Sequence, residues 1–333
     1  MLEHGGALRA VAIRYGIALN QWLDLSTGIN PRGWPVPPVP TPVWRRLPEE
    51  DDGLERAAAA YYGTDQLLPV PGSQAAIQAL PALRGIGRVG ILTPGYNEYA
   101  RAWRYYGHTV VPLAAAAIDS ALADIDVLVL GNPNNPTGAR FTPETLLGWR
   151  IQLAQRGGWL VVDEAFMDAT PEQTLALQAD LPGLIVLRSL GKFFGLAGIR
   201  VGFVLCEDVL RNRLQEHLGP WAVNGPGRWI AARALLDRGW QREMRRTLQR
   251  SSLRLAELLN RYDLQIGGGT LLFQWLLQED AEFFQEALAR RGIWVRRFDD
   301  PPSLRLGLPD SDTAWRRLHQ ALAGIRAQRQ TRR

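Results

Sequence analysis

The feature that most constrains the fold is a series of short apolar runs separated by segments with helical character. The runs are Val89–Leu92, Val127–Leu130, Trp159–Val162, Leu184–Leu187 and Val201–Leu205. A continuously apolar strand is buried on both faces, which is typical of a mainly parallel sheet with helices on either side. Helical segments such as Ser73–Leu80 and Pro143–Gln155 lie between several of these runs. The pattern predicts an α/β fold built around such a sheet.

The remaining segments indicate a second, smaller lobe, because 333 residues exceed one ordinary compact core. We expect the first 40 residues to be irregular and the Pro-rich stretch 31–42 to form an extended strap. Residues 54–62 are expected to form a helix that ends at Gly63, and residues 229–260 are strongly helical and rich in Arg. An α+β end is expected from strands at 271–275, 293–295 and 304–306, a helix at 282–291 and a closing helix from Asp312.

Composition excludes several classes of function. The net charge of +5 is spread through the chain, and no basic face with interleaved aromatic residues predicts nucleic-acid binding. No apolar stretch reaches transmembrane length, and the first ten residues lack the apolar core of a signal peptide. A lone cysteine, Cys206, permits no internal disulfide, which fits the cytoplasm, and the four histidines are too scattered to predict a metal site.

Polar side chains follow three of the expected strands. The first strand runs into Gly131–Gly138 (Gly-Asn-Pro-Asn-Asn-Pro-Thr-Gly), the second into Asp163-Glu164, and the third into Arg188–Lys192 (Arg-Ser-Leu-Gly-Lys). Open α/β sheets bind ligands in the crevice outside the carboxyl ends of their strands. The sequence therefore predicts one site at which these three segments converge.

Lys192 is the single lysine among 38 Lys and Arg residues. Arg cannot lose its proton in a protein, whereas a Lys amine can, and can then attack a carbonyl to form a Schiff base. A coding bias toward Arg is the alternative explanation. It accounts for the excess of Arg, but it does not account for a surviving Lys just after an apolar strand.

The residue types at the strand ends match the needs of pyridoxal 5'-phosphate (PLP). PLP withdraws electrons when its ring nitrogen is protonated, and Asp163 is the candidate that holds this proton. Asn135 is the candidate donor to the phenolic oxygen of the cofactor. The alternatives are that Asp163 caps the following segment and that the Asn-Pro run is only a turn; Pro136 and Gly138 shape the backbone in either case.

A phosphate group needs backbone donors and a cation. Gly72-Ser73-Gln74 opens an expected helix, whose N-terminus would present N–H groups, although such a sequence is also a common helix cap. Ser189 supplies a hydroxyl, and Arg200 can form a bidentate contact with phosphate. Tyr96 follows another strand end, where it either stacks on the cofactor ring or packs as an ordinary aromatic residue.

In combination and in this order, these segments resemble the fold type I family of PLP enzymes, which includes aspartate aminotransferase. The resemblance implies a large PLP-binding domain over residues 41–230, and a small domain formed by 1–40 and 231–333. It also implies that Lys192 and Asp163 are catalytic, and that the chain is a homodimer with its active sites at the subunit interface. Small departures are present: Leu47 stands where relatives often have a Tyr that reaches the partner's cofactor phosphate, and Gly191 where they have Ser or Thr.

Several segments resemble the threonine-phosphate decarboxylases of cobalamin biosynthesis within this family. They are His4–Gly6, Leu25–Pro31, Pro94–Tyr99, Val186–Phe193 and Pro220–Asn224. Phe166 also favours the decarboxylases, because aminotransferases of this family usually carry Tyr at that position. This resemblance implies decarboxylation of L-threonine O-3-phosphate to (R)-1-amino-2-propanol O-2-phosphate, and leaves open a contact with the next enzyme of that pathway.

Lys, Asp and Asn serve decarboxylation and transamination equally, so the groups that bind the substrate's anions decide the reaction. Arg305 matches the family's substrate-carboxylate Arg, with one more surface Arg as the alternative. His4, Asn30 and Arg32, together with Asn135, are the other candidates for substrate binding. Two alternatives stay open. One is a histidinol-phosphate-type aminotransferase with a 2-oxo acid acceptor, and the other is a non-catalytic subunit of the same fold.

Overall fold

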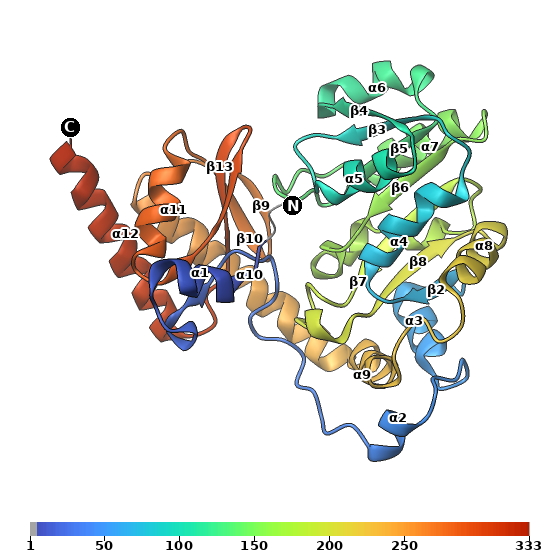
Figure 1. Ribbon diagram of the computed structural model, residues 1–333, viewed down its shortest axis with the longest axis horizontal. Coiled ribbons are helices and arrows are strands. Elements are labelled where there is room, and N and C mark those ends of the chain that lie inside the picture. Colours follow the sequence, from blue (N-terminus) through green and yellow to red (C-terminus); the bar gives the residue numbers. More distant parts are fainter. Residues whose placement is uncertain (1–4, 333) are drawn as a thin grey trace. The chain divides into compact units, whose positions relative to one another are not determined.

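The computed structural model describes residues 5–332 and divides into two compact units (Figure 1). The larger unit comprises residues 33–135 and 139–243, and the smaller comprises 5–32, 136–138 and 244–332.

A mixed, mostly parallel sheet forms the centre of the larger unit. Within the described residues it has seven strands in the order β2-β8-β7-β6-β5-β3-β4. β8 is antiparallel to both of its neighbours, β2 and β7, and the other neighbouring pairs are parallel. The predicted α/β fold is therefore confirmed. The strands are β2 (Leu67–Val70), β3 (Arg88–Leu92), β4 (Thr109–Leu113), β5 (Val127–Gly131), β6 (Trp159–Asp163), β7 (Leu184–Ser189) and β8 (Gly202–Cys206).

Both faces of this sheet are buried, which explains why its central strands are continuously apolar up to the polar residues at their carboxyl ends. Val127 and Val129 of β5 belong to one hydrophobic cluster, which also takes in side chains of α4, α5 and α8, whereas Leu128 and Leu130 are fully buried outside that cluster. The helices of this unit are α2 (Thr41–Arg45), α3 (Leu54–Tyr62), α4 (Ser73–Ala79), α5 (Glu98–Tyr105), α6 (Ile118–Ala121), α7 (Pro143–Ala154), α8 (Asp208–Leu218) and α9 (Gly225–Leu236).

The two edge strands, β2 and β4, escaped prediction. Each contains a proline, Pro69 in β2 and Pro112 in β4, and β4 is only partly buried. Proline cannot donate to a neighbouring strand, so within sheets it is confined largely to edges. The same residue that marks these segments as edge strands thus weakens their strand signal in the sequence.

The expectation of an irregular N-terminus was wrong for the first part of the segment. Residues 8–15 form helix α1 (Leu8–Tyr15), and β1 (Leu23–Asp24) pairs in parallel with β11 (Ile293–Trp294) in the smaller unit. Val11 and Trp22 form a small apolar cluster there, which holds the segment in place. Of the strap predicted over 31–42, residues 31–40 have no helix or strand, whereas the last two residues begin α2. Trp34 N–H donates to Phe194 O at 2.8 Å.

The predicted helical stretch 229–260 consists of two helices, α9 and α10 (Arg238–Arg261), which are separated at Asp237. Asp237 has a non-helical backbone, and its Oδ1 accepts a hydrogen bond from Trp240 N–H at 3.0 Å. An aspartate in this position caps the helix that follows, so one continuous pattern of residues becomes two elements.

An antiparallel sheet with the order β12-β13-β10-β9 and the helices α11 and α12 complete the described part of the smaller unit. These elements follow the predicted α+β pattern. The two edge strands of this sheet, β12 and β9, were not predicted. Their bounds are β9 (Ile266–Thr270), β10 (Phe273–Leu277), α11 (Ala281–Ala289), β12 (Arg296–Asp299), β13 (Pro302–Gly307) and α12 (Asp312–Arg332). Among the described residues, no helix combines the length and apolar character needed to cross a bilayer.

Candidate active site

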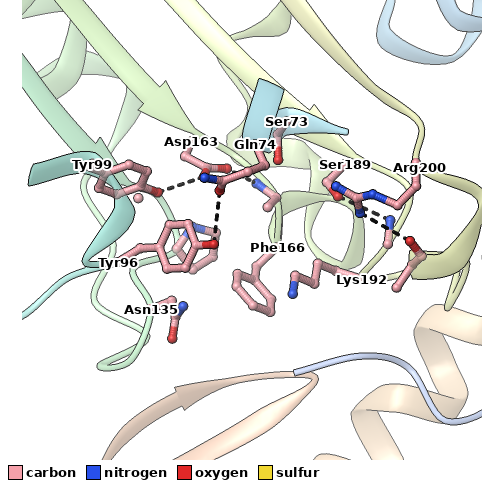
Figure 2. A pocket seen from close by; sticks show the side chains of 15 residues that line it. Ser73, Gln74, Tyr96, Tyr99, Asn135, Asp163, Phe166, Ser189, Lys192 and Arg200 are labelled. Carbon is pink, nitrogen blue, oxygen red and sulfur yellow. Dashed lines mark hydrogen bonds between the residues drawn. The ribbon is translucent and has the colours of Figure 1, made fainter. Parts of the chain in front are cut away.

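The three predicted strand ends open into one pocket of the larger unit (Figure 2). β5, β6 and β7 are neighbours in the sheet and run parallel, so their carboxyl ends lie at the same edge. The pocket is lined by eight of the residues that were predicted to hold a cofactor. They are Ser73, Gln74, Tyr96, Asn135, Asp163, Ser189, Lys192 and Arg200.

Lys192 lies three residues beyond the end of β7, and its amine faces an aromatic ring. Lys192 Nζ is 5.4 Å from the centroid of the Phe166 ring, and both side chains line the pocket. Figure 2 shows the two side by side. Phe166 follows β6 and carries no hydroxyl, so this side of the pocket offers an apolar surface to whatever binds against the amine.

Asp163 ends β6 and is only 7% exposed. Its Oδ2 accepts a hydrogen bond of 2.7 Å from the Tyr99 hydroxyl, and its Oδ1 accepts one of 2.9 Å from Ala165 N–H. Burial raises the pKa of Asp163, while these donors and the charges of Lys192 and Arg188 act in the opposite direction. Asp163 is therefore a buried carboxylate in the pocket wall, with donors that favour its charged form.

Tyr96 is held in the pocket by a short chain of polar contacts. Its hydroxyl donates to Gln74 Oε1 at 3.1 Å, and Gln74 Nε2 donates to the buried Glu98 at 3.3 Å. Burial raises the pKa of Tyr96 to about 12, so the phenol is neutral at ordinary pH. The ring lies edge-on to Tyr99, with centroids 5.4 Å apart. Tyr96 is thus a fixed aromatic ring in the pocket wall and stays the candidate to stack on a planar ligand.

The opposite end of the pocket suits an anion. Ser73, Ser189 and Arg200 line it, and Gly191 N–H donates to Ser189 Oγ at 3.2 Å. Gly72 has a φ of 77°, and a Cβ on this residue would lie 2.5 Å from Arg200 Nη2. Glycine thus allows the guanidinium to approach the backbone just before Ser73, although Gly72 does not itself line the pocket.

The Asn-Pro run after β5 forms a loop that its own side chains stabilise. Asn132 Nδ2 donates to Phe141 O at 3.2 Å and Phe141 N–H donates to Asn132 Oδ1 at 3.0 Å, while Asn134 Nδ2 donates to Pro94 O at 2.8 Å. Asn135 lines the pocket. The run is therefore both a turn and a source of a pocket residue, as the two interpretations of the sequence allowed.

A buried ionic cluster, which no sequence signal singled out, joins the residues just beyond Asp163 to the end of β7. Arg188 donates through Nη1 to Glu164 Oε2 at 2.6 Å and through Nη2 to Asp168, and all three side chains are at most 2% exposed. Arg188 Nη1 also donates to Thr174 Oγ1 at 3.0 Å. Since Glu164 follows Asp163 and Arg188 precedes Ser189, the cluster links two segments that supply pocket residues.

Three of the predicted substrate-binding residues, Asn30, Arg32 and Arg305, belong to the smaller unit. His4 lies outside the described residues. Arg305 on β13 is 6% exposed, and its Nη2 donates to Ser26 O at 2.7 Å. Asn30 is buried and its Oδ1 accepts from Arg32 N–H at 2.9 Å, whereas the exposed Arg32 donates to Asp310 O at 3.3 Å.

Arg296 is a further candidate for substrate binding, which the sequence did not indicate. It is the cross-strand partner of Arg305 in the β12–β13 pair. Burial, and to a smaller extent the charge of Arg296, lowers the pKa of Arg305 to about 10, which Asp24 partly opposes. The two residues occupy facing positions on neighbouring strands, which makes the pair a candidate for binding an anion.

The chemistry of the pocket fits PLP. The amine suits the aldehyde of that cofactor, and the buried carboxylate suits its ring nitrogen. The fixed aromatic ring suits the face of the cofactor ring, and the two hydroxyls beside a guanidinium suit its phosphate. The close approach of Arg200 to Gly72 is an independent sign of an anion-binding end, because a side chain at position 72 would displace the guanidinium.

Comparisons with known proteins agree with this geometry. The model of the aminotransferase class I and II family matches residues 47–321. A threonine-phosphate decarboxylase of Pseudomonas aeruginosa is 55% identical over 98% of this chain and 98% of its own, and one of a Sinorhizobium species is 42% identical over 97% and 98%.

A solved histidinol-phosphate aminotransferase of Sinorhizobium meliloti, in complex with pyridoxal-5'-phosphate, has the same fold. Its TM-score is 0.84 at 19% identity, and the match covers 97% of this chain and 95% of that one. With the family match over most of the sequence, these findings lead to one conclusion: the chain belongs to the aminotransferase class I and II family, and its cofactor is PLP.

Proposed function

We propose that this chain decarboxylates L-threonine O-3-phosphate to (R)-1-amino-2-propanol O-2-phosphate and CO2, as a step of cobalamin biosynthesis. The observation that carries the proposal is the likeness, over 98% of both chains, to a protein named for this decarboxylation. The pocket around Lys192 supports it, because its residues have the chemistry that a PLP-dependent lyase needs.

Bound PLP supplies an electron sink for the pair of electrons that is left when a bond to the substrate's α-carbon breaks. Lys192 would hold the cofactor through Nζ, and Asp163 would hold the proton on the ring nitrogen. Tyr96 would cover one face of the ring, and Asn135 would donate to the phenolic oxygen. Phe166 cannot add a hydroxyl donor to that oxygen, so Asn135 bears more of this task.

The cofactor phosphate would bind to Ser73, Ser189 and Arg200, with Gly72 and Gln74 shaping and supporting that end of the pocket. Gly191 contributes no hydroxyl, but its N–H fixes the Ser189 side chain. Leu47 also lacks a hydroxyl, and its side chain is 62% exposed. Phosphate binding would therefore rest on Ser73, Ser189 and Arg200 of the same subunit.

Selection of the bond that breaks is a matter of positioning, since the cofactor residues serve either reaction. We propose that Arg305, supported by Arg296, binds an anionic group of the substrate. The low exposure of Arg305 supports this role, because a buried cation prefers a fixed anionic partner. His4, Asn30 and Arg32 remain proposals for the substrate phosphate. Of these, Arg32 is exposed and offers a cation.

We propose further that the chain is a cytoplasmic homodimer with the large and small domains named above. Large apolar side chains exposed on the larger unit support a subunit interface: Val36, Trp44, Leu47 and Trp221 are between 48% and 65% exposed. Trp221 and Pro48, the residue after Leu47, line one surface hollow of this unit. Contact with the next enzyme of the pathway is a separate proposal.

Product analysis separates the two candidate reactions. Purified holoenzyme is incubated with O-phospho-L-threonine or with histidinol phosphate, each with and without 2-oxoglutarate. We expect 1-amino-2-propanol O-2-phosphate from the first substrate without any oxo acid. Glutamate formed from histidinol phosphate and 2-oxoglutarate, with no amino alcohol from the first substrate, would instead identify an aminotransferase. Absence of a borohydride-reducible link between PLP and Lys192 would favour a non-catalytic role.

A further inference from the structure

Tyr99 makes the shortest side-chain contact to the carboxylate of the pocket. Its hydroxyl donates to Asp163 Oδ2 at 2.7 Å, while Ala165 N–H donates to Oδ1 at 2.9 Å. Tyr99 is 4% exposed and Asp163 7%. Figure 2 shows the Tyr99 ring directed at Asp163 from the neighbouring element α5. Each carboxylate oxygen therefore has one fixed donor that water cannot readily replace.

The surroundings of Asp163 act in two opposite directions. Burial favours the neutral acid and is the larger effect, so the pKa is raised. The groups that favour the charged carboxylate are Tyr99 from α5, Ala165 N–H from the segment after β6, and the cations Arg188 and Lys192 from β7 and beyond. Tyr99 stays a donor throughout, because burial and Asp163 raise its own pKa well above that of an ordinary phenol.

We propose that Tyr99 is a positioning residue, which keeps Asp163 charged so that a proton shared with the cofactor's ring nitrogen resides on the nitrogen. The inference rests on the PLP site of the proposed function and adds to it a residue that acts through Asp163. Without the hydroxyl, the buried carboxylate becomes the stronger base of the pair, and the shared proton moves toward Asp163.

The size of the effect follows from the kind of hydrogen bond. A hydrogen bond to a charged group is worth about 1.5–3 kcal/mol, which changes the ratio of the two proton positions about tenfold to a hundredfold. A proton that lies on the nitrogen in the wild type would then be shared or lost to Asp163 in the variant. Because the two groups titrate together, the position of the proton, rather than one pKa, is the quantity to measure.

Tyr99→Phe removes the hydroxyl alone, and the holoenzyme is studied with PLP labelled with 15N in the ring and without substrate. We expect the 15N resonance to move from the protonated toward the unprotonated position. Tyr105→Phe is the matched control, because Tyr105 is on the same helix and 82% exposed. It should keep the wild-type resonance. An unchanged resonance in Tyr99→Phe would overturn the proposal, whatever the fate of the decarboxylation experiment.

Two further measurements test the proposal if Tyr99→Phe retains too little PLP for the 15N experiment. In apoenzyme labelled with 13C-aspartate, Tyr99→Phe should raise the pKa of Asp163, because the hydroxyl that favours the charged carboxylate is gone, and no rise would contradict the proposal. In an Asp163→Asn background, Tyr99→Phe should change PLP affinity and absorbance no further, because Tyr99 acts through Asp163. Additive losses in this double-mutant cycle would mean that Tyr99 is merely structural.

Discussion

Arg188→Met tests whether the buried ionic cluster holds the strand ends together. In the wild type, Arg188 donates to Glu164, Thr174 and Asp168 and lies 4.8 Å from the centre of the Tyr62 ring. Methionine keeps much of the side-chain volume but leaves two buried carboxylates without their cation. Breaking a buried pair in this way costs about 3–5 kcal/mol of folding free energy.

The loss should depend on pH, with a definite sign. Burial already raises the pKa of Glu164, and removing Arg188 removes the largest opposing charge. A carboxyl with a raised pKa in the folded state binds protons more readily there than in the unfolded chain. The unfolded chains titrate alike, so the deficit of Arg188→Met follows the difference between the two folded states. It should be smallest where Glu164 is protonated in both folded proteins, and grow as pH rises from the folded pKa of Glu164 in the wild type toward its higher folded pKa in the variant.

Urea denaturation of the apoenzyme at several pH values measures both quantities. Arg290→Met is the control, because its ion pair with Glu286 is largely exposed and is worth less than about 1 kcal/mol. Adding Glu164→Gln to Arg188→Met should recover part of the loss, since one of the uncompensated charges disappears. A loss below 1 kcal/mol, or a deficit that shrinks as pH rises, would refute the account of this cluster.

Three other variants concern the pocket itself. Lys192→Arg should form no borohydride-reducible link with PLP and show no turnover, because Arg keeps its proton; near-normal turnover would remove Lys192 from the mechanism. Asp163→Asn should retain part of its cofactor but lose most activity, measured as kcat for CO2 release, and wild-type rates would assign the ring-nitrogen role elsewhere. Gly72→Ala should weaken PLP binding in equilibrium dialysis, because its Cβ would displace Arg200 and because the backbone at φ 77° and ψ 151° costs a residue with a side chain about 1–3 kcal/mol. An unchanged Kd would separate Arg200 from the phosphate.

The sequence was sufficient to predict the centre of the fold, because its buried parallel strands are continuously apolar until they end in polar residues. The three ends at Asn135, Asp163 and Lys192 line one pocket for the same reason. Edge strands carry weaker signals, as Pro69 and Pro112 show, because an edge strand pairs on one side only and therefore tolerates proline. The short helix α1 depends on packing against distant residues, which local patterns do not contain.

Partners that meet only in three dimensions could not be predicted. Tyr99 is one aromatic residue in an amphipathic helix, and nothing nearby in the chain marks it as a donor to Asp163, which is 64 residues away. Arg188 was recognised only as the flank of a motif, although its contacts with Glu164 and Asp168 are nearly free of solvent. Arg296 becomes notable only through its pairing with Arg305 across two strands.

The measurement that tests the central claim most directly is the release of labelled CO2 from O-phospho-L-threonine carrying 13C in its carboxylate. Holoenzyme is compared with Lys192→Arg, each without a 2-oxo acid. We predict stoichiometric 13CO2 and 1-amino-2-propanol O-2-phosphate from the wild type, and neither product from the variant. Wild-type holoenzyme that binds PLP at Lys192 and yet releases no labelled CO2 would contradict the proposed reaction.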